Sequence, residues 1–138
     1  MYRLFIACVL MGGPASLTAQ VTDIEATAER ARQAWLAHDP AALVANTPRL
    51  LIQLPGAEPS VAVGPAQAAA LLADFVAPAL EVETEIRAAR EVEPGRGYVE
   101  LQRRYRVSGT QNVRVQILLL GYRLDETGWR LVEFRVVG

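Results

Sequence analysis

The feature that most constrains this chain is a change near residue 80 from a mostly helical pattern to four long strands. Three turn signals divide the strand half, at residues 93–97, 108–112 and 125–128. Helices followed by a strand meander are typical of an α+β fold. We therefore predict N-terminal helices packed in the concave face of a strongly curved, mainly antiparallel sheet, a cone-like shape with a pocket on its concave side.

The first twenty residues have the pattern of a secretory signal peptide. Arg3 precedes an apolar run over residues 4–11, and small residues follow up to Ala19. This run is too short to cross a membrane, which needs about twenty apolar residues. We therefore predict that residues 1–20 are removed, that the protein is exported to the periplasm or secreted, and that residues 21–138 form a single domain with no membrane attachment.

The composition argues against several classes of function. The chain has 14 basic and 15 acidic residues, and this balance gives no basic face for nucleic acid. The one cysteine, Cys8, lies in the predicted leader, and His38 is the one histidine. Because too few metal ligands remain, we predict no metal site, no cofactor and no disulfide.

Capping signals predict three helices before the strands. Thr22 and Glu25 form a capping box at the first helix, whose apolar stripe is Ile24, Ala28, Ala31 and Trp35. Asp39 caps a short second helix, and Gly64 precedes the third. Two small strands are expected between the last two helices, at residues 50–54 and 61–63.

The first two long strands alternate between apolar and charged residues, so each is predicted to have one buried and one wet face. The wet face of the first carries Glu81, Glu83 and Glu85. Arg103 breaks the pattern of the second strand, because it falls on the apolar face beside Tyr105. A buried guanidinium needs a carboxylate, a carbonyl, water or a ligand. A bulge at Arg103 or a side chain extended to the rim would also explain it.

These residues are the candidate ligand site. Arg103 and Tyr105 share a face with apolar neighbours, and Glu133 would enter the same cavity if Trp129 and Leu131 face inward. Glu133 would then be the partner of Arg103. Alternatively, Arg103, Tyr105 and Glu133 would bind a small amphipathic ligand with a carboxylate or carbonyl end.

The third strand, residues 113–123, is apolar on both faces through residues 117–120. The fourth has Trp129 and Leu131 on one face, and Val132, Phe134 and Val136 on the other. Too few other elements remain to cover a second apolar face. We therefore predict a homodimer through the outer sheet face, with Leu118 and Leu120 in the contact.

The order of elements resembles the nuclear-transport-factor-2-like superfamily. The motifs that carry the resemblance are residues 35–40 (WLAHDP), the third helix that begins at Gly64, and residues 129–134 (WRLVEF). The superfamily shares a cone-shaped α+β fold among ketosteroid isomerase, polyketide cyclases, scytalone dehydratase and the association domain of calmodulin-dependent kinase. The closing segment is most similar to the association domain, in which an arginine near the end of this strand lines the cavity. This chain has Val136 there.

The resemblance leaves two functions open. Isomerase-like members use a carboxylate base inside the cone, and dehydratase-like members use inward histidine and aspartate. Here the inward positions are nearly all apolar, Asp39 is a helix cap, and His38 at a helix end is expected to bond the last carbonyls. The sequence therefore favours a non-catalytic domain that binds a small molecule or a partner, with a small isomerase, dehydratase or cyclase as the alternative.

Overall fold

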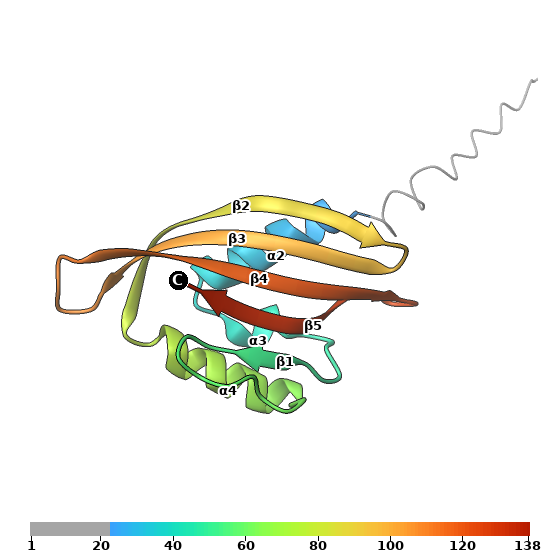
Figure 1. Ribbon diagram of the computed structural model, residues 1–138, viewed down its shortest axis with the longest axis horizontal. Helices are drawn as coiled ribbons and strands as arrows, with labels where there is room; N and C mark the ends of the chain where they lie inside the picture. The colour runs from blue at the N-terminus through green and yellow to red at the C-terminus, as the bar shows by residue number, and fades with distance from the viewer. Residues whose placement is uncertain (1–22) are drawn as a thin grey trace, which may run out of the picture.

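The computed structural model describes residues 23–138, so the predicted signal peptide lies outside the described residues. Three helices and a short strand precede four long strands (Figure 1). The elements are α2 (Ile24–Leu36), α3 (Pro40–Leu43), β1 (Leu51–Gln53), α4 (Pro65–Val76), β2 (Ala79–Glu93), β3 (Arg96–Val107), β4 (Val113–Asp125) and β5 (Gly128–Val137). The predicted order of helices and then a strand meander is confirmed.

The helices begin where short polar or proline signals allow. Asp23 caps α2 by accepting a hydrogen bond from the backbone N–H of Ala26, so the predicted cap at Thr22 was one residue early. A carboxylate at this position accepts a hydrogen bond from a free backbone N–H of the first turn, and its negative charge is stabilised by the positive end of the helix dipole. Asp39 caps α3 as predicted, and Gly64 precedes α4 with a proline in its first turn.

The strands form one five-stranded sheet in the order β1-β5-β4-β3-β2. The long strands pair antiparallel with their sequence neighbours, whereas β1 adds to the far edge by parallel pairing with β5. Helix α2 packs across β2 and β3 on one face, and α4 lies near β1 at the other edge (Figure 1). The helices therefore cover one face of the sheet and leave the other face, called here the outer face, open.

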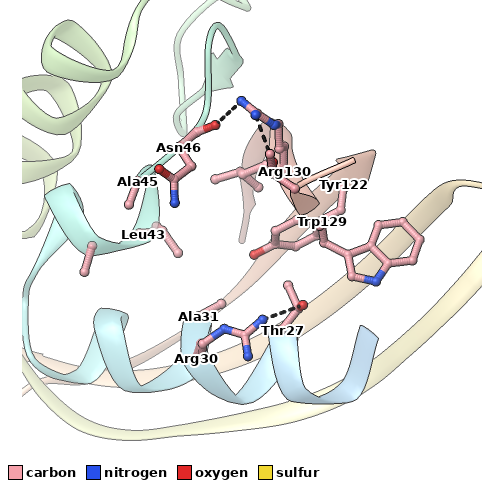
Figure 2. Close-up of a pocket in the computed structure, with 13 residues that line it drawn as sticks. Thr27, Arg30, Ala31, Leu43, Ala45, Asn46, Tyr122, Trp129 and Arg130 are labelled. Atoms are coloured by element: carbon pink, nitrogen blue, oxygen red, sulfur yellow. Dashed lines mark hydrogen bonds between the residues drawn. The ribbon is translucent and has the colours of Figure 1, made fainter. Parts of the chain in front are cut away.

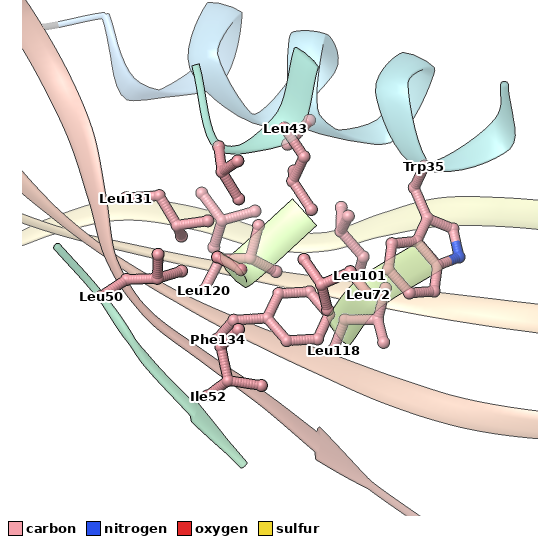
Figure 3. Close-up of a cluster of buried hydrophobic side chains, with 14 of the residues drawn as sticks. Trp35, Leu43, Leu50, Ile52, Leu72, Leu101, Leu118, Leu120, Leu131 and Phe134 are labelled. Atoms are coloured by element: carbon pink, nitrogen blue, oxygen red, sulfur yellow. The ribbon is translucent and has the colours of Figure 1, made fainter. Parts of the chain in front are cut away.

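The covered face holds a single apolar core (Figure 3). Trp35 of α2 stacks on Phe134 of β5 with ring centres 5.6 Å apart. Around them lie buried side chains from every helix and from the sheet, among them Leu43, Leu50, Ile52, Leu72, Leu101, Leu118, Leu120 and Leu131. Side chains therefore occupy the interior of the cone.

Helix α2 packs closely against β3 at Gly97. A Cβ atom at this position would lie 2.6 Å from Cδ1 of Ile24 and 3.1 Å from Cζ3 of Trp129. Only a glycine lets both side chains rest on the strand. The first turn of α2 and the ring of Trp129 are thus positioned together.

Register shifts change which side chains of β2 face inward. The pairing of β2 with β3 skips Val82, Arg87 and Val92, and each extra residue reverses the alternation between the residues before it and those after it. Leu80 and Val82, predicted to be buried, are 51% and 47% exposed, whereas the side chain of Glu81 is 3% exposed. The predicted wet position of Glu81 was therefore wrong.

A register shift between β4 and β5 also changes which residues of these strands face inward. The pairing of β4 with β5 skips Val132, which brings Leu131 and Phe134 to the same inner face. Leu118 and Leu120 also lie in the core, so their predicted place in a subunit contact was wrong. The alternate residues Ile117 and Leu119 are the ones on the outer face, since strand neighbours point to opposite sides.

Candidate functional site

Arg103 is the largest fully buried side chain in the described part of the chain, with 1% of its surface exposed. It lies on β3, and its guanidinium is bonded on both sides. Nε donates to Oε2 of Glu81 at 3.3 Å, and Nη2 donates to Oε1 of the same carboxylate. Nη1 donates to Oε1 of the buried Gln116 at 3.2 Å. The bidentate pair fixes the plane of the guanidinium.

Three aromatic rings surround the same guanidinium. Its Cζ atom lies 4.0 Å from the ring centre of Tyr105, 5.0 Å from that of Trp35 and 5.6 Å from that of Phe75. A cation over aromatic faces is stabilised by the ring quadrupoles. Burial lowers the pKa of Arg103, and the negative charge of Glu81 opposes that shift. We call Arg103, Glu81, Gln116 and the three rings the arginine cage.

His38 lies at the edge of the arginine cage. It follows α2 in the left-handed conformation, with φ of 50°, and its Nε2 is 3.4 Å from Oε1 of Glu81. The side chain therefore faces Glu81. Its predicted role, a hydrogen bond to the last carbonyls of the helix, was wrong. Its ring is part-exposed, so it closes the cage toward solvent.

The structure brings Arg103 and Tyr105 together, but not Glu133. The carboxylate of Glu133 lies on the opposite side of the sheet, 3.8 Å from Nε of Arg135, and is 46% exposed. The predicted Arg103–Glu133 pair was wrong, because the shift at Val82 turns Glu81 inward and the shift at Val132 turns Glu133 outward. Ligand binding by Arg103, Tyr105 and Glu133 stays a prediction.

Sequence reasoning missed Glu81 because nothing in the amino-acid sequence marks Val82 as the residue that the pairing of β2 with β3 skips. Gln116 did leave a signal in the sequence, since it is a polar residue directly before the apolar run of β4. In the structure it pairs with Arg103 in the register. A buried arginine opposite a buried glutamine on the neighbouring strand is the pattern that would have found it.

A separate pocket of about 310 Å³ lies between α2, α3 and the turn that joins β4 to β5 (Figure 2). We call it the mouth pocket. Its buried lining is Thr27, Ala31, Leu43, Tyr122 and Leu131. Its remaining lining is Arg30, Ala42, Ala45, Asn46, Thr127, Gly128, Trp129 and Arg130.

Tyr122 is the polar group of the pocket floor. The residue is 5% exposed, and Figure 2 shows its hydroxyl pointing toward the middle of the pocket. None of the hydrogen bonds among residues 23–138 that the structure defines uses this hydroxyl. Burial raises the pKa of Tyr122, and the positive charge of Arg30 opposes the shift, so at neutral pH the phenol is protonated and can donate.

Two arginines lie on the rim of the mouth pocket. Arg130 is held by Asp125, by the Thr127 hydroxyl at 2.9 Å and by the backbone carbonyl of Asn46. Arg30 donates to Oγ1 of Thr27 at 3.1 Å and makes no ion pair with another described residue. The described lining contains no carboxylate and no histidine.

Within residues 23–138, no three histidine, cysteine, aspartate or glutamate side chains come together as a metal site would require. None of the described helices combines the length and the apolar character needed to span a bilayer.

No family model matches this chain, and no curated protein matches it either. Solved structures do match it in fold. A ketosteroid isomerase-like protein from Erwinia carotovora atroseptica has a TM-score of 0.65 at 19% identity, over 82% of this chain and 91% of that one. A domain of unknown function with a cystatin-like fold from Nostoc punctiforme has a TM-score of 0.65 at 15% identity, over 91% of this chain and 78% of that one.

A third structure was solved with a small molecule. It is a protein with a ketosteroid isomerase-like fold from Catenulispora acidiphila in complex with trimethylamine, with a TM-score of 0.62 at 12% identity over 80% of this chain and 82% of that one. Identities this low describe the fold alone. The chain therefore has the cone-shaped α+β fold of the nuclear-transport-factor-2-like superfamily, as its sequence predicted.

Proposed function

We propose that this protein is a non-catalytic binding domain that takes a small organic molecule in the mouth pocket. The observation that carries the proposal is the hydroxyl of Tyr122, a residue that is 5% exposed; this hydroxyl faces the pocket and has no hydrogen-bond partner among the described residues. Because the hydroxyl opens into the pocket, an acceptor on a ligand can take the hydrogen bond that the hydroxyl does not make to protein. The trimethylamine complex of the Catenulispora protein supports the idea that this fold can hold a small molecule.

The lining supports binding over catalysis. General acid–base chemistry needs a group that can exchange a proton near neutral pH, and the described lining offers neither a carboxylate nor a histidine. Inside the cone, Glu81 is the buried carboxylate, and it is bonded on both oxygens by Arg103. An isomerase, dehydratase or cyclase that uses Arg103, Tyr105 and Glu133 is the alternative, and the separation of Glu133 from the other two counts against it.

Blocking the pocket tests this proposal. Ala41 and Ala42 are neighbouring exposed residues of α3, but only Ala42 lines the pocket. In a fragment screen by protein NMR, molecules that shift the Tyr122 and Leu131 resonances should lose binding in Ala42→Trp and keep it in Ala41→Trp. Equal binding in both variants, or no fragment at these resonances, would contradict the proposal.

We also propose that the outer face joins two copies of the chain. Its middle is apolar, with Ile117 and Leu119 flanked by half-exposed Val115 and Val137. Leu119 lies between Glu100 on β3 and Arg135 on β5 in the register. A twofold axis along β4, between two facing sheets, would set each Glu100 against the partner copy's β5 and its arginine.

Light scattering at tens of micromolar tests the dimer, since weak association is visible in about that range. Leu119→Glu would place a charge in the contact and should shift the protein to monomer. Val61→Glu is the control, because Val61 is 81% exposed in the segment before α4. A monomeric wild-type protein would rule the dimer out.

Export is proposed on the basis of the apolar run at residues 4–11 and the small residues that follow. N-terminal sequencing of the native protein should begin near Gln20 or Val21. A cytosolic protein that retains Met1 would contradict export.

A further inference from the structure

The charged groups that line the mouth pocket are all positive. They are Arg30 on α2 and Arg130 on β5. Asp125 neutralises Arg130, and that guanidinium is further held by Thr127 and Asn46. Arg30 has only a hydroxyl partner among the described residues, so its charge is uncompensated at the pocket.

The uncompensated charge lies close to the unpartnered hydroxyl. The charge of Arg30 acts on the Tyr122 phenol, and Figure 2 shows the Tyr122 hydroxyl directed into the pocket and the Arg30 guanidinium along α2 beside Thr27. Both are donors: a guanidinium has no acceptor, and a phenol bonds readily to an anion. Two donors that line one pocket, with no carboxylate in its described lining to pair with them, form one half of an anion site.

The rest of the lining sets the shape of the ligand. Leu43, Leu131 and Ala31 are buried and apolar, and the ring of Trp129 forms one side. A volume of about 310 Å³ lies at the lower end of the range for ligand pockets, roughly 300–1,000 Å³. The space suits one ring or a short chain attached to a polar head.

We propose that the mouth pocket selects small organic monoanions, with a carboxylate between the Tyr122 hydroxyl and the Arg30 guanidinium and an apolar body against Leu43, Leu131 and Trp129. This inference rests on the proposed binding function. A cation of the same size is disfavoured by Arg30, and a neutral amide gains less from a charged donor. Because Arg30 is exposed, the preference weakens with added salt.

Three probes of nearly the same shape test the selection: phenylacetate, phenylacetamide and 2-phenylethylamine, with trimethylamine as a fourth. Titrations followed by NMR at neutral pH and low salt should give phenylacetate an affinity at least about tenfold above that of the amide, which is the scale of one charge-assisted hydrogen bond. The two amines should bind more weakly than the amide.

Two variants assign the donors. Arg30→Gln should remove most of the difference between acid and amide, while Arg32→Gln should preserve it, because Arg32 pairs with Glu29 and does not line the pocket. Tyr122→Phe should lower the affinity for phenylacetate by roughly tenfold and leave the fold intact.

The outcomes separate the two proposals. If the amide or an amine binds as well as phenylacetate and Ala42→Trp abolishes both, the pocket binds small molecules and the selection for anions is overturned. Equal effects of Arg30→Gln and Arg32→Gln would overturn the role of Arg30. If none of the four probes shifts the pocket resonances at about 10 mM, a concentration that detects even very weak sites, both the selection and the binding function fail.

Discussion

The Arg103 guanidinium in the arginine cage and the Tyr122 hydroxyl in the mouth pocket both belong to buried residues, but they differ in how their hydrogen bonds are satisfied. In the cage, Arg103 has bonds to Glu81 and Gln116 and contacts with three rings, and its guanidinium is enclosed by its own chain. In the mouth pocket, the Tyr122 hydroxyl has no described partner. A complete set of partners indicates a structural role, whereas an incomplete set beside open space indicates a place for a ligand.

Removing the carboxylate of the cage should have the largest effect on stability. Glu81→Leu would leave Arg103 charged and buried without its pair, and we expect a loss of about 3–5 kcal/mol in the free energy of unfolding. Urea denaturation measures it. The double variant Glu81→Leu with Arg103→Leu should recover much of the loss, and Glu133→Leu should change little. A small effect of the single variant would show that the cage is not closed.

Gln116→Leu should have a smaller effect in the same direction. It removes one acceptor from Nη1 of Arg103 and keeps both bonds to Glu81, so about 1–3 kcal/mol is expected. Urea denaturation measures the loss in the free energy of unfolding for this variant, and Gln102→Leu on the outer face is the control. Equal losses would mean that the amide adds nothing specific.

His38→Ala should cost at most about 1 kcal/mol, because the contact with Glu81 is 3.4 Å long and the histidine is part-exposed. Thermal melts at low and high salt test this, since an exposed charge contact is weakened by ions. A loss as large as that of Gln116→Leu would make His38 a full member of the cage.

Tyr122→Phe should have the smallest effect on stability, near zero, although Tyr122 is about as buried as Trp35 and Gln116 of the cage. Its hydroxyl has no described protein bond to lose, so only ligand binding should fall. Thermal melts with and without phenylacetate separate the effect on stability from the effect on ligand binding. A large loss of stability in the empty protein would place the hydroxyl in a structural bond and remove the contrast between the two regions.

The order of elements could be read from the sequence because its signals are local. Asp39 and Gly64 mark helix starts, and the three turns divide the strands at the predicted places. Strand faces were harder, because alternation assumes an unbroken register and four shifts break it, three in β2 and one in β5. Arg103 was correctly singled out as an exception, but its partner lay beyond a shift that leaves no mark in the sequence.

The mouth pocket could not be predicted for a different reason. Its lining comes from α2, α3 and the β4–β5 turn, and none of these segments carries a motif by itself. Thr27 and Arg30 look like ordinary helix residues, and Tyr122 looks like an ordinary strand residue. Their shared chemistry depends on the curvature of the sheet, which brings the segments together only in the folded chain.

The parallel pairing of β1 with β5 has a consequence for synthesis. It joins Leu51 to Glu133, so the sheet cannot be completed until the last strand has been made. Until then Leu50 and Ile52, both core residues, lack the strand that they pack beside. Pairings so distant in sequence form late and slowly. A nascent chain without β5 would therefore leave the sheet incomplete, and the pairing of β5 with β1 is the step that closes the fold.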